Sequence, residues 1–260
     1  MELDGKVAVV TGGSRGIGRA IARRLAEQGA DVVIAARTVT TLQTTADEIA
    51  VATGRRVEPV PADLSALDGC EELHREATAR FDHIDILVNC AGATKSGHFL
   101  ELPDELWQEG FDLKFFGAVR LCRLFWPQLA ATHGSVVHVV GGMARTPNPN
   151  FAIGGAVNAA LANFGKALAG LGLADDVNVN IVHPGQTQTE RLTEMMADQA
   201  ARQGTTGDQV LAETIQRQGI RRLGTPEDVA ELVAFLCRPQ ARHIHGAAIS
   251  VDGGATRSLF

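Results

Sequence analysis

Short runs of β-branched and other apolar residues alternate along the chain with longer segments in which apolar residues recur every three or four positions. The short runs predict seven strands: Val7–Thr11, Val32–Ala36, Val57–Val60, Ile84–Asn89, Ser135–Val140, Asn178–Val182 and Ala247–Val251. Consecutive apolar positions are typical of parallel strands that helices cover on both faces. The segment Gly16–Gln28 carries Ile21 and Leu25 at helical spacing. The alternation predicts an α/β protein with a doubly wound parallel sheet.

Two later helices begin with capping signals. Ser65 precedes Asp68 by three positions, which predicts a capping box. Thr225 is followed by Pro226 and acidic residues, the pattern of a capped helix with proline at its first position. No linker rich in proline, glycine or serine interrupts the alternation, so we predict a single domain over residues 1–260. The polar, helical stretch around 190–222 predicts an excursion that covers the substrate site as a lid.

Composition narrows the class of protein. The 260 residues carry a net charge of −6 and no basic stripe, which argues against nucleic acid as a partner. The longest apolar runs fall far short of the roughly 20 residues that cross a membrane. The amino terminus is acidic where a signal peptide is basic. The four cysteines show no C-x-x-C spacing, and no metal-binding cluster stands out. We expect a cytoplasmic protein without a metal, acting on a small molecule.

A glycine-rich turn joins the first predicted strand to the first predicted helix. It reads Thr11-Gly-Gly-Ser-Arg-Gly-Ile-Gly18. Glycines let a backbone turn sharply and approach a pyrophosphate closely, and the helix that follows supplies free N–H groups and the positive end of its dipole. Because this turn stands between a strand and a helix, as phosphate binding requires, it predicts a dinucleotide site.

The end of the second predicted strand indicates which dinucleotide binds. About 20 residues after the glycine-rich turn, NAD sites place an acidic residue on the ribose 2′-hydroxyl. This chain has Ala35-Ala36-Arg37 there, with no carboxylate. The Arg37 guanidinium can pair with a 2′-phosphate, and Arg15 can approach it from the turn. The sequence therefore favours NADP(H) over NAD(H).

These residues, in this order, resemble the classical short-chain dehydrogenase/reductase family over nearly the whole chain. The matching motifs are Thr11-Gly12-x-x-x-Gly16-x-Gly18, Asp63, Asn89-Cys-Ala-Gly92, Pro184-Gly185 with Thr189, and Val251-Asp-Gly-Gly254. The resemblance implies one Rossmann-type domain that assembles into tetramers or dimers. It assigns cofactor contacts to Gly12, Ser14, Arg15, Gly16, Ile17, Gly18, Arg37, Asp63, Leu64, Asn89, Ala91, Gly92, Pro184, Gly185, Thr187 and Thr189.

The family's catalytic residues are a Ser, a Tyr, a Lys and an Asn. The Tyr exchanges a proton with the substrate oxygen, and the Lys lowers the pKa of that Tyr. Matching the family's landmarks puts Gly154 at the Tyr, Asn158 at the Lys, Gly141 at the Ser and Lys114 at the Asn. The chain contains no tyrosine, so no shift of the alignment supplies one. The resemblance thus implies a degenerate active site that cannot use the family's standard mechanism.

Three interpretations remain open at this point. In the first, the protein is an oxidoreductase by lineage, of carbonyl or 3-oxoacyl type, or a non-redox enzyme with a repurposed site. Lys114 and Asn158 have then exchanged places, Lys114 acts as an acid or an oxyanion clamp, and the two glycines leave room for a bulkier ligand. In the second, it is an inactive NADP(H) sensor or partner subunit. In the third, only the scaffold functions.

Several side chains have a second interpretation. Lys114 is one of four lysines, and it could also be an exposed residue on a helix between subunits. We expect His138 to be a core histidine with its hydrogen bonds satisfied. His183 should be held by backbone contacts at a strand end, and Phe151 should line the pocket or its lid.

Overall fold

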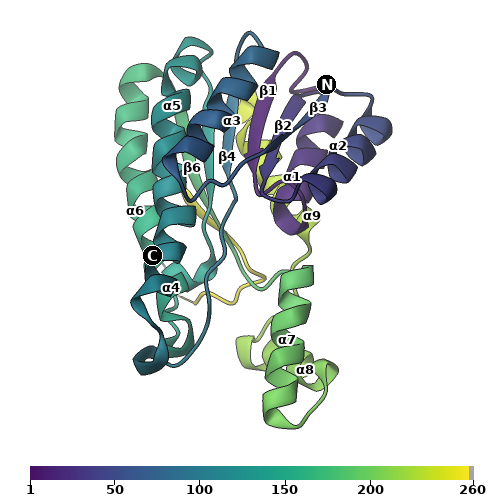
Figure 1. Ribbon diagram of the computed structural model, residues 1–260, viewed down its shortest axis with the longest axis vertical. Helices are drawn as coiled ribbons and strands as arrows, with labels where there is room; N and C mark the ends of the chain where they lie inside the picture. Colours follow the sequence, from purple (N-terminus) through teal and green to yellow (C-terminus); the bar gives the residue numbers. More distant parts are fainter. Residues whose placement is uncertain (258–260) are drawn as a thin grey trace.

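Seven parallel strands form the centre of the computed structural model, which describes residues 1–257. They are β1 (Val7–Thr11), β2 (Asp31–Ala36), β3 (Val57–Pro61), β4 (Ile86–Asn89), β5 (Ser135–Val139), β6 (Asn178–Pro184) and β7 (Ala248–Val251). Their order is β3-β2-β1-β4-β5-β6-β7, so the winding reverses between β1 and β4 (Figure 1). The predicted doubly wound sheet is confirmed. Such sheets bind ligands at the carboxyl ends of the strands beside this reversal.

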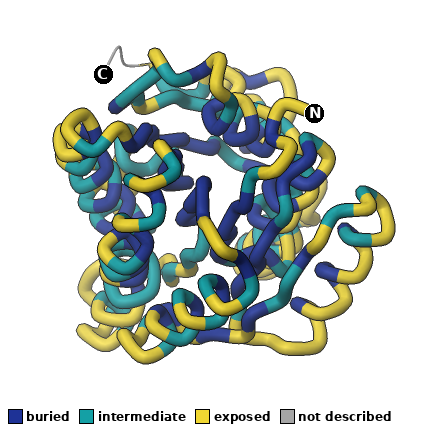
Figure 2. Tube along the Cα trace, turned by 90° about the horizontal axis from the view of Figure 1, so that it is seen from above, coloured by how far each residue is buried: buried dark blue, intermediate teal, exposed yellow. Residues whose placement is uncertain are grey.

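Helices cover both faces of the sheet. One face carries α1 (Gly16–Glu27), α2 (Val39–Thr53) and α9 (Pro226–Leu236), and the other carries α3 (Leu67–Arg80), α5 (Gly117–Ala131) and α6 (Ala152–Asp175). The helix α4 (Asp104–Phe111) continues through a π-helical turn, Asp112–Phe116, into α5. Figure 2 shows the buried residues in the middle of the molecule and the exposed ones on its outer turns. None of the helices in residues 1–257 is long and apolar enough to cross a membrane.

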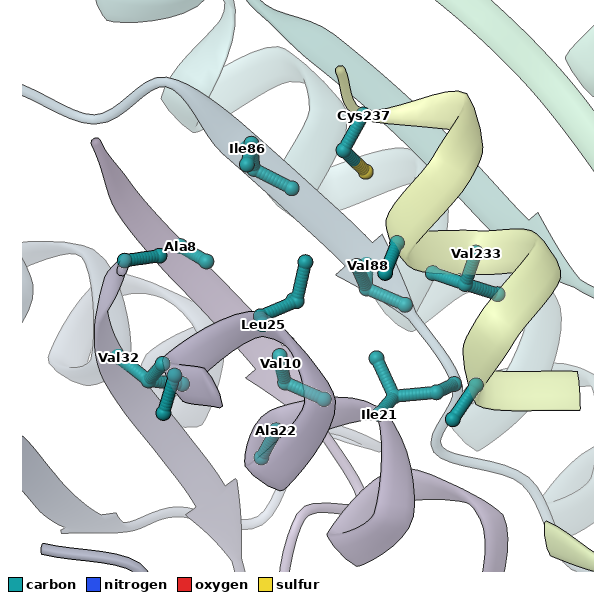
Figure 3. Packing of buried hydrophobic residues seen from close by; sticks show 14 of the residues in the cluster. Ala8, Val10, Ile21, Ala22, Leu25, Val32, Ile86, Val88, Val233 and Cys237 are labelled. Carbon is teal, nitrogen blue, oxygen red and sulfur yellow. The ribbon is translucent and has the colours of Figure 1, made fainter. Parts of the chain in front are cut away.

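The packing of α1 and α9 on the sheet fixes where α1 begins. Ile21 and Leu25 of α1 lie against Val10 of β1 and Val88 of β4, with Val233 of α9 beside them (Figure 3). All five side chains are fully buried. Burying such a side chain contributes about 1.5–3 kcal/mol. The amino end of α1 is therefore held rigidly at the carboxyl edge of the strands.

Residues 185–224 leave the sheet after β6 and return to it at α9. They contain α7 (Glu190–Gln203) and α8 (Gly207–Gln218), which stand apart from the body in Figure 1. The hydroxyl groups of Thr189 and Thr206 cap the two helices. The predicted excursion exists, and its helices lie beyond the carboxyl ends of the strands. Its role as a lid stays a prediction.

The capping box predicted at Ser65 is wrong. The helix α3 begins at Leu67, and its N-cap residue Ala66 has no side-chain oxygen to cap it. The Ser65 hydroxyl instead donates to the Asp63 carboxylate at 2.8 Å, and the Ser65 N–H donates to the same oxygen at 3.1 Å. The carboxylate two positions earlier thus orients the hydroxyl away from the helix. The capped helix start predicted at Thr225, with Pro226 at the first helical position, is confirmed, and Asp228 completes a capping box there.

Contrary to the prediction, the buried histidine of β5 does not have both of its ring nitrogens hydrogen-bonded. His138 is fully buried, and its Nδ1 lies 3.4 Å from the amide nitrogen of Asn89. Its Nε2 has no hydrogen-bond partner among the described residues. Phe164 packs edge-on against the ring at 5.8 Å between centroids. Burial among these groups lowers the pKa of His138 to about 4.

We expect the His138 ring to make the fold sensitive to acid. An unfolded histidine has a pKa of 6.5, so between pH 6.5 and about 4 the unfolded chain binds a proton that the native ring does not. The free energy of unfolding should fall by about 3 kcal/mol as the pH drops through this range. Urea unfolding between pH 7 and 4 checks this, with His138→Leu losing that part of the slope. The exposed His243→Gln is the control, and equal slopes in His138→Leu and wild type would contradict the expectation.

Candidate functional site

The predicted cofactor residues gather at the carboxyl ends of five strands. They follow β1 (Gly12, Ser14, Arg15, Gly16, Ile17, Gly18), β2 (Arg37), β3 (Asp63, Leu64), β4 (Asn89, Ala91, Gly92) and β6 (Pro184, Gly185, Thr187, Thr189). The parallel sheet brings these five loops to one edge. Sequence reasoning could not supply this proximity by itself, because the residues span almost 180 positions of the chain.

Hydrogen bonds tie the glycine-rich turn to its neighbouring strands. The N–H groups of Gly12 and Gly13 donate to the carbonyl of Ala35 at the end of β2, at 2.8 and 3.2 Å. On the other side, the Thr11 hydroxyl accepts from the N–H groups of Cys90 and Ala91 at 2.9 and 3.0 Å. These hydrogen bonds fix the position of the turn relative to both flanking strands.

The turn also requires glycine at particular positions. Gly12 and Gly16 have φ values of +70° and +53°, a region that side chains disfavour. A Cβ on Gly18 would lie 2.7 Å from the carbonyl carbon of Gly12 and closer still to its oxygen. The first residues of α1 pack directly on the turn because Gly18 has no side chain.

The start of α1 fits an anion. Arg15 is its N-cap residue, no side chain among the described residues caps the helix, and its first turn carries no acid. Its first N–H groups therefore need acceptors from outside the helix, which a pyrophosphate supplies. Arg15 and Arg37 are both exposed at this edge, and Arg37 lowers the pKa of the Asp63 carboxyl, as the Ser65 hydrogen bonds do more strongly. The residues present fit a dinucleotide that bears an extra phosphate.

The loop after β6 closes the site from the opposite side. The Thr187 side chain is buried and donates to the carbonyl of Gly185 at 3.1 Å. The Thr189 methyl group lies against Gly16 of the glycine-rich turn, within 3.3 Å of where a Cβ on Gly16 would be. The amino end of α7 and the amino end of α1 therefore meet at the same place.

Lys114 is not an exposed interface residue. It lies on the π-helical turn between α4 and α5, and its Nζ donates to the carbonyl oxygen of Val140, the residue that follows β5. Its aliphatic chain covers Gly92, because a Cβ at Gly92 would be 2.7 Å from the Lys114 Cδ. A π-helical turn re-aims a side chain within a helix and is often found at functional sites.

Burial changes the acid–base behaviour of Lys114. Desolvation is the main cause that lowers the pKa of its ammonium group to about 8, and the positive charge of Arg191 contributes to the same shift. Burial likewise raises the pKa of the neighbouring Cys90 thiol to about 12, so this thiol is uncharged in the range where Lys114 titrates. At neutral pH the amine is mostly protonated, yet it can release its proton within the range in which enzymes work.

Gly141 and Asn158 lie directly beside this lysine. Gly141 follows Val140 and has a φ of +137°, which only glycine adopts readily. A Cβ on Gly141 would lie 2.8 Å from the side-chain nitrogen of Asn158 on α6. Asn158 is 5% exposed, and its Oδ1 has no hydrogen-bond partner among residues 1–257. The ammonium and the amide thus both lie at the segment Val140–Gly141, as the predicted exchange of places requires.

The space expected at Gly154 is filled. A Cβ on Gly154 would lie 2.6 Å from the Cδ1 of Phe151 and closer to two other ring atoms. The phenyl ring therefore occupies the position where a side chain at 154 would start. The expectation that both glycines leave room for a bulkier ligand is wrong at this position, because an aromatic residue three positions earlier folds back over the glycine.

His183 is held as expected, and it also belongs to this group. It is 2% exposed on β6, and its Nδ1 lies 3.1 Å from the carbonyl oxygen of Gly141. Burial lowers the pKa of the ring, and the positive charges of Arg145 and Lys114 lower it further. Lys114 and His183 therefore bind consecutive carbonyl groups, those of Val140 and Gly141.

Two contacts of this site carry little signal in the sequence. Arg191 extends from the first turn of α7 to the loop after β4, where it donates to the carbonyls of Gly92 and Thr94 at 3.2 and 2.7 Å. The Val140 carbonyl that holds Lys114 is a backbone group with no sequence signature. No three His, Cys, Asp or Glu side chains in the described part of the chain are grouped to hold a metal ion.

Comparison with known proteins gives one consistent result. The sequence model of a family described as Enoyl-(Acyl carrier protein) reductase matches residues 12–256. The chain is 33% identical to the 3-oxoacyl-(acyl-carrier-protein) reductase FabG of Escherichia coli, over 98% of each chain. It is 33% identical to L-sorbose reductase from Gluconobacter frateurii, solved with NADPH and L-sorbose, with a TM-score of 0.95 over 100% of both chains.

A further solved structure agrees. A short chain dehydrogenase from Burkholderia cenocepacia in complex with NADP is 31% identical and has a TM-score of 0.87, over 98% of this chain and 99% of that one. Similarity of this extent covers the sheet, both helix layers and the loops that carry the predicted cofactor residues. This chain belongs to the short-chain dehydrogenase/reductase family.

Proposed function

We propose that the protein is an NADP(H)-dependent oxidoreductase that reduces a carbonyl group, with Lys114 in the role of the absent tyrosine. The observation that carries the proposal is the position of Lys114, whose stem covers Gly92 and whose ammonium is held at the Val140 carbonyl. An amine with a pKa near 8 can both stabilise negative charge on a carbonyl oxygen and give that oxygen a proton.

The chain's own residues would hold the cofactor as follows. The first N–H groups of α1, at Gly16–Gly18, receive the pyrophosphate, and Arg15 and Arg37 receive the 2′-phosphate. Asp63 would contact the adenine, and Gly92 and Pro184–Thr189 would flank the nicotinamide. NADPH, when bound, supplies the hydride. This preference for NADP(H) is supported by the absence of a carboxylate at the end of β2.

Lys114 and Asn158 divide the remaining work. The Lys114 Nζ donates a hydrogen bond to the carbonyl oxygen of the substrate and gives it a proton as the alcohol forms. The Asn158 amide is buried with its Oδ1 unpartnered among residues 1–257, so it can accept a hydrogen bond from the Lys114 ammonium or from a substrate hydroxyl. Phe151 covers Gly154, so an apolar ring stands where the family has its tyrosine.

We also expect a cytoplasmic homo-oligomer, a tetramer or a dimer. Apolar side chains are exposed on the outer faces of the α5 and α6 region, with Phe116 40%, Leu171 50% and Leu173 74% exposed. Large apolar side chains that stay exposed on a single chain are candidates for a subunit interface. Light scattering of the purified protein measures the assembly.

The test separates binding from chemistry. The purified protein is titrated with NADPH and with NADH in a calorimeter, and NADPH oxidation is then followed with a panel of ketones, quinones and enones. We expect tight NADPH-preferring binding and turnover of at least one ketone. NADPH binding without turnover of any compound would favour the sensor instead, and no binding of either nucleotide would contradict both interpretations.

Arg37 should decide the choice between the two cofactors. Replacing Arg37 with alanine removes a charge-assisted contact worth about 1.5–3 kcal/mol, so the NADPH dissociation constant should rise by about 10- to 100-fold. The NADH dissociation constant should stay unchanged, because NADH has no 2′-phosphate. Calorimetry of both nucleotides measures the two effects. Arg19→Ala, an exposed substitution on α1, is the control, and an equal loss of NADH affinity in Arg37→Ala would contradict the assignment.

A further inference from the structure

Arg191 crosses from the excursion to the body of the protein at the proposed site. Its guanidinium donates to the carbonyl oxygens of Gly92 and Thr94, at 3.2 and 2.7 Å, and is largely withdrawn from solvent. A guanidinium carries five N–H donors. Two are used in these bonds, and the other donors have no acceptor among residues 1–257. The group is therefore held in a fixed orientation with hydrogen-bonding capacity to spare.

Gly92 is the point at which two cations meet. The Arg191 Nη1 bonds to its carbonyl oxygen, and the Lys114 side chain lies against its α-carbon. Neither Arg191 nor Lys114 forms an ion pair with a carboxylate in the described part of the chain, since both donate only to backbone carbonyls. Two like charges that share one glycine repel each other, and a bound anion would relieve that repulsion.

The surroundings supply little negative charge. Burial lowers the pKa of the Arg191 guanidinium, and the positive charge of Arg15 lowers it further; only Glu194, one helical turn along α7, opposes this. The Lys114 and Arg191 side chains thus come from two separate elements to Gly92. A guanidinium and an ammonium in such an arrangement match a carboxylate, which accepts hydrogen bonds on both of its oxygens.

We propose that Arg191 is a specificity-determining residue that binds the carboxylate of an oxo-acid substrate, with Lys114 at the carbonyl group to be reduced. The proposal rests on the proposed reductase function and adds the substrate class, carbonyl compounds that carry a carboxylate. It also explains why the contact comes from α7. An acid bound between α7 and the loop after β4 bridges the excursion and the body, so substrate binding holds the two together.

The cofactor pyrophosphate is the other anion that Arg191 could meet. The position of its hydrogen bonds argues for the substrate, because they lie on the loop after β4, beside Lys114, and not on the glycine-rich turn where α1 begins. The two possible anions predict different binding defects when Arg191 is replaced. Loss of a pyrophosphate contact weakens NADPH binding, whereas loss of a substrate contact weakens the binding of acids to the cofactor complex.

The experiment measures binding, so it does not depend on turnover. The probes are 2-, 3- and 4-oxopentanoate and their methyl esters, titrated calorimetrically into the protein saturated with NADP⁺, which cannot reduce them. We expect wild type to bind at least one acid more tightly than its ester. Arg191→Gln should weaken that acid by about 10- to 100-fold, the value of a charge-assisted hydrogen bond, and leave the ester and the NADPH dissociation constant unchanged. Arg191→Lys, which keeps the charge, should restore part of the acid affinity.

The control is Arg202→Gln, because Arg202 is exposed on the last turn of the same helix. Thermal unfolding verifies that each variant is folded. Equal affinity of wild type for acids and esters would overturn the inference, and so would a weaker NADPH complex in Arg191→Gln with acid binding unchanged. Failure of wild type to bind NADPH at all would instead contradict the proposed function, so the two failures are distinguishable.

Discussion

Replacing Lys114 with methionine should lower kcat for NADPH-dependent carbonyl reduction by about 10²- to 10⁴-fold, the usual contribution of a general acid. Methionine keeps the aliphatic stem that covers Gly92 and removes only the charged group at Val140. The NADPH dissociation constant should change little, because the amine lies beyond the phosphate-binding edge. Steady-state kinetics and calorimetry on the same preparation measure the two effects separately.

The pH profile gives a second measure of the same group. Because Lys114 donates a proton when protonated, the rate of reduction should be constant below its pKa of about 8 and fall tenfold for each pH unit above it. Lys95→Met is the control, since Lys95 lies on the loop that follows the same N-C-A-G motif and is exposed. A rate that depends on Lys95 and not on Lys114 would contradict the assignment of the proton donor.

Replacing Gly18 with alanine should abolish NADPH binding and lower the free energy of unfolding by about 1–3 kcal/mol, as overpacking typically does. The new methyl group would overlap the backbone carbonyl group of Gly12. Neither this carbonyl group nor a Cβ can turn away as a flexible side chain would. This overlap can be removed only if the glycine-rich turn moves away from α1. That movement separates the turn from the N–H groups that would bind the pyrophosphate.

Gly170→Ala is the matched control for this substitution. Gly170 lies within α6, and a Cβ there would have no atom within 4 Å. Alanine should therefore raise the free energy of unfolding, by up to about 1 kcal/mol, through its higher helix propensity. Urea unfolding and NADPH titration of both variants measure the contrast. Wild-type affinity in Gly18→Ala would show that the close contact at Gly12 has no role in binding.

The strands were predictable because their signal is local. A strand buried on both faces must be apolar along its whole length, and this is visible in the sequence of Val7–Thr11 or Val32–Ala36 without reference to any partner. The glycine-rich turn was predictable for a related reason, since its backbone conformations and close approaches restrict it to glycine. Composition adds one further point that needs no structure, because a chain without tyrosine cannot place one in its site.

Contacts between distant residues were not predictable in the same way. The hydroxyl of Ser65 fits a capping box by its spacing, and only the folded loop shows that it donates its hydrogen bond to Asp63 instead. Gly154 reads as an open space, yet Phe151 folds back over it. In both cases the residue types are visible in the sequence. Which neighbour the side chain contacts depends on how the loop folds.

The sequence by itself determined the parallel sheet, the dinucleotide turn, the arginine at the end of β2 and the absence of a tyrosine donor, because each depends on local pattern or on composition. Only the tertiary structure decided that Lys114 points inward to Val140, that Asn158 lies against Gly141 and that Arg191 reaches Gly92. These contacts join residues up to 99 positions apart. Their partners are backbone groups, which every residue carries and no sequence pattern marks.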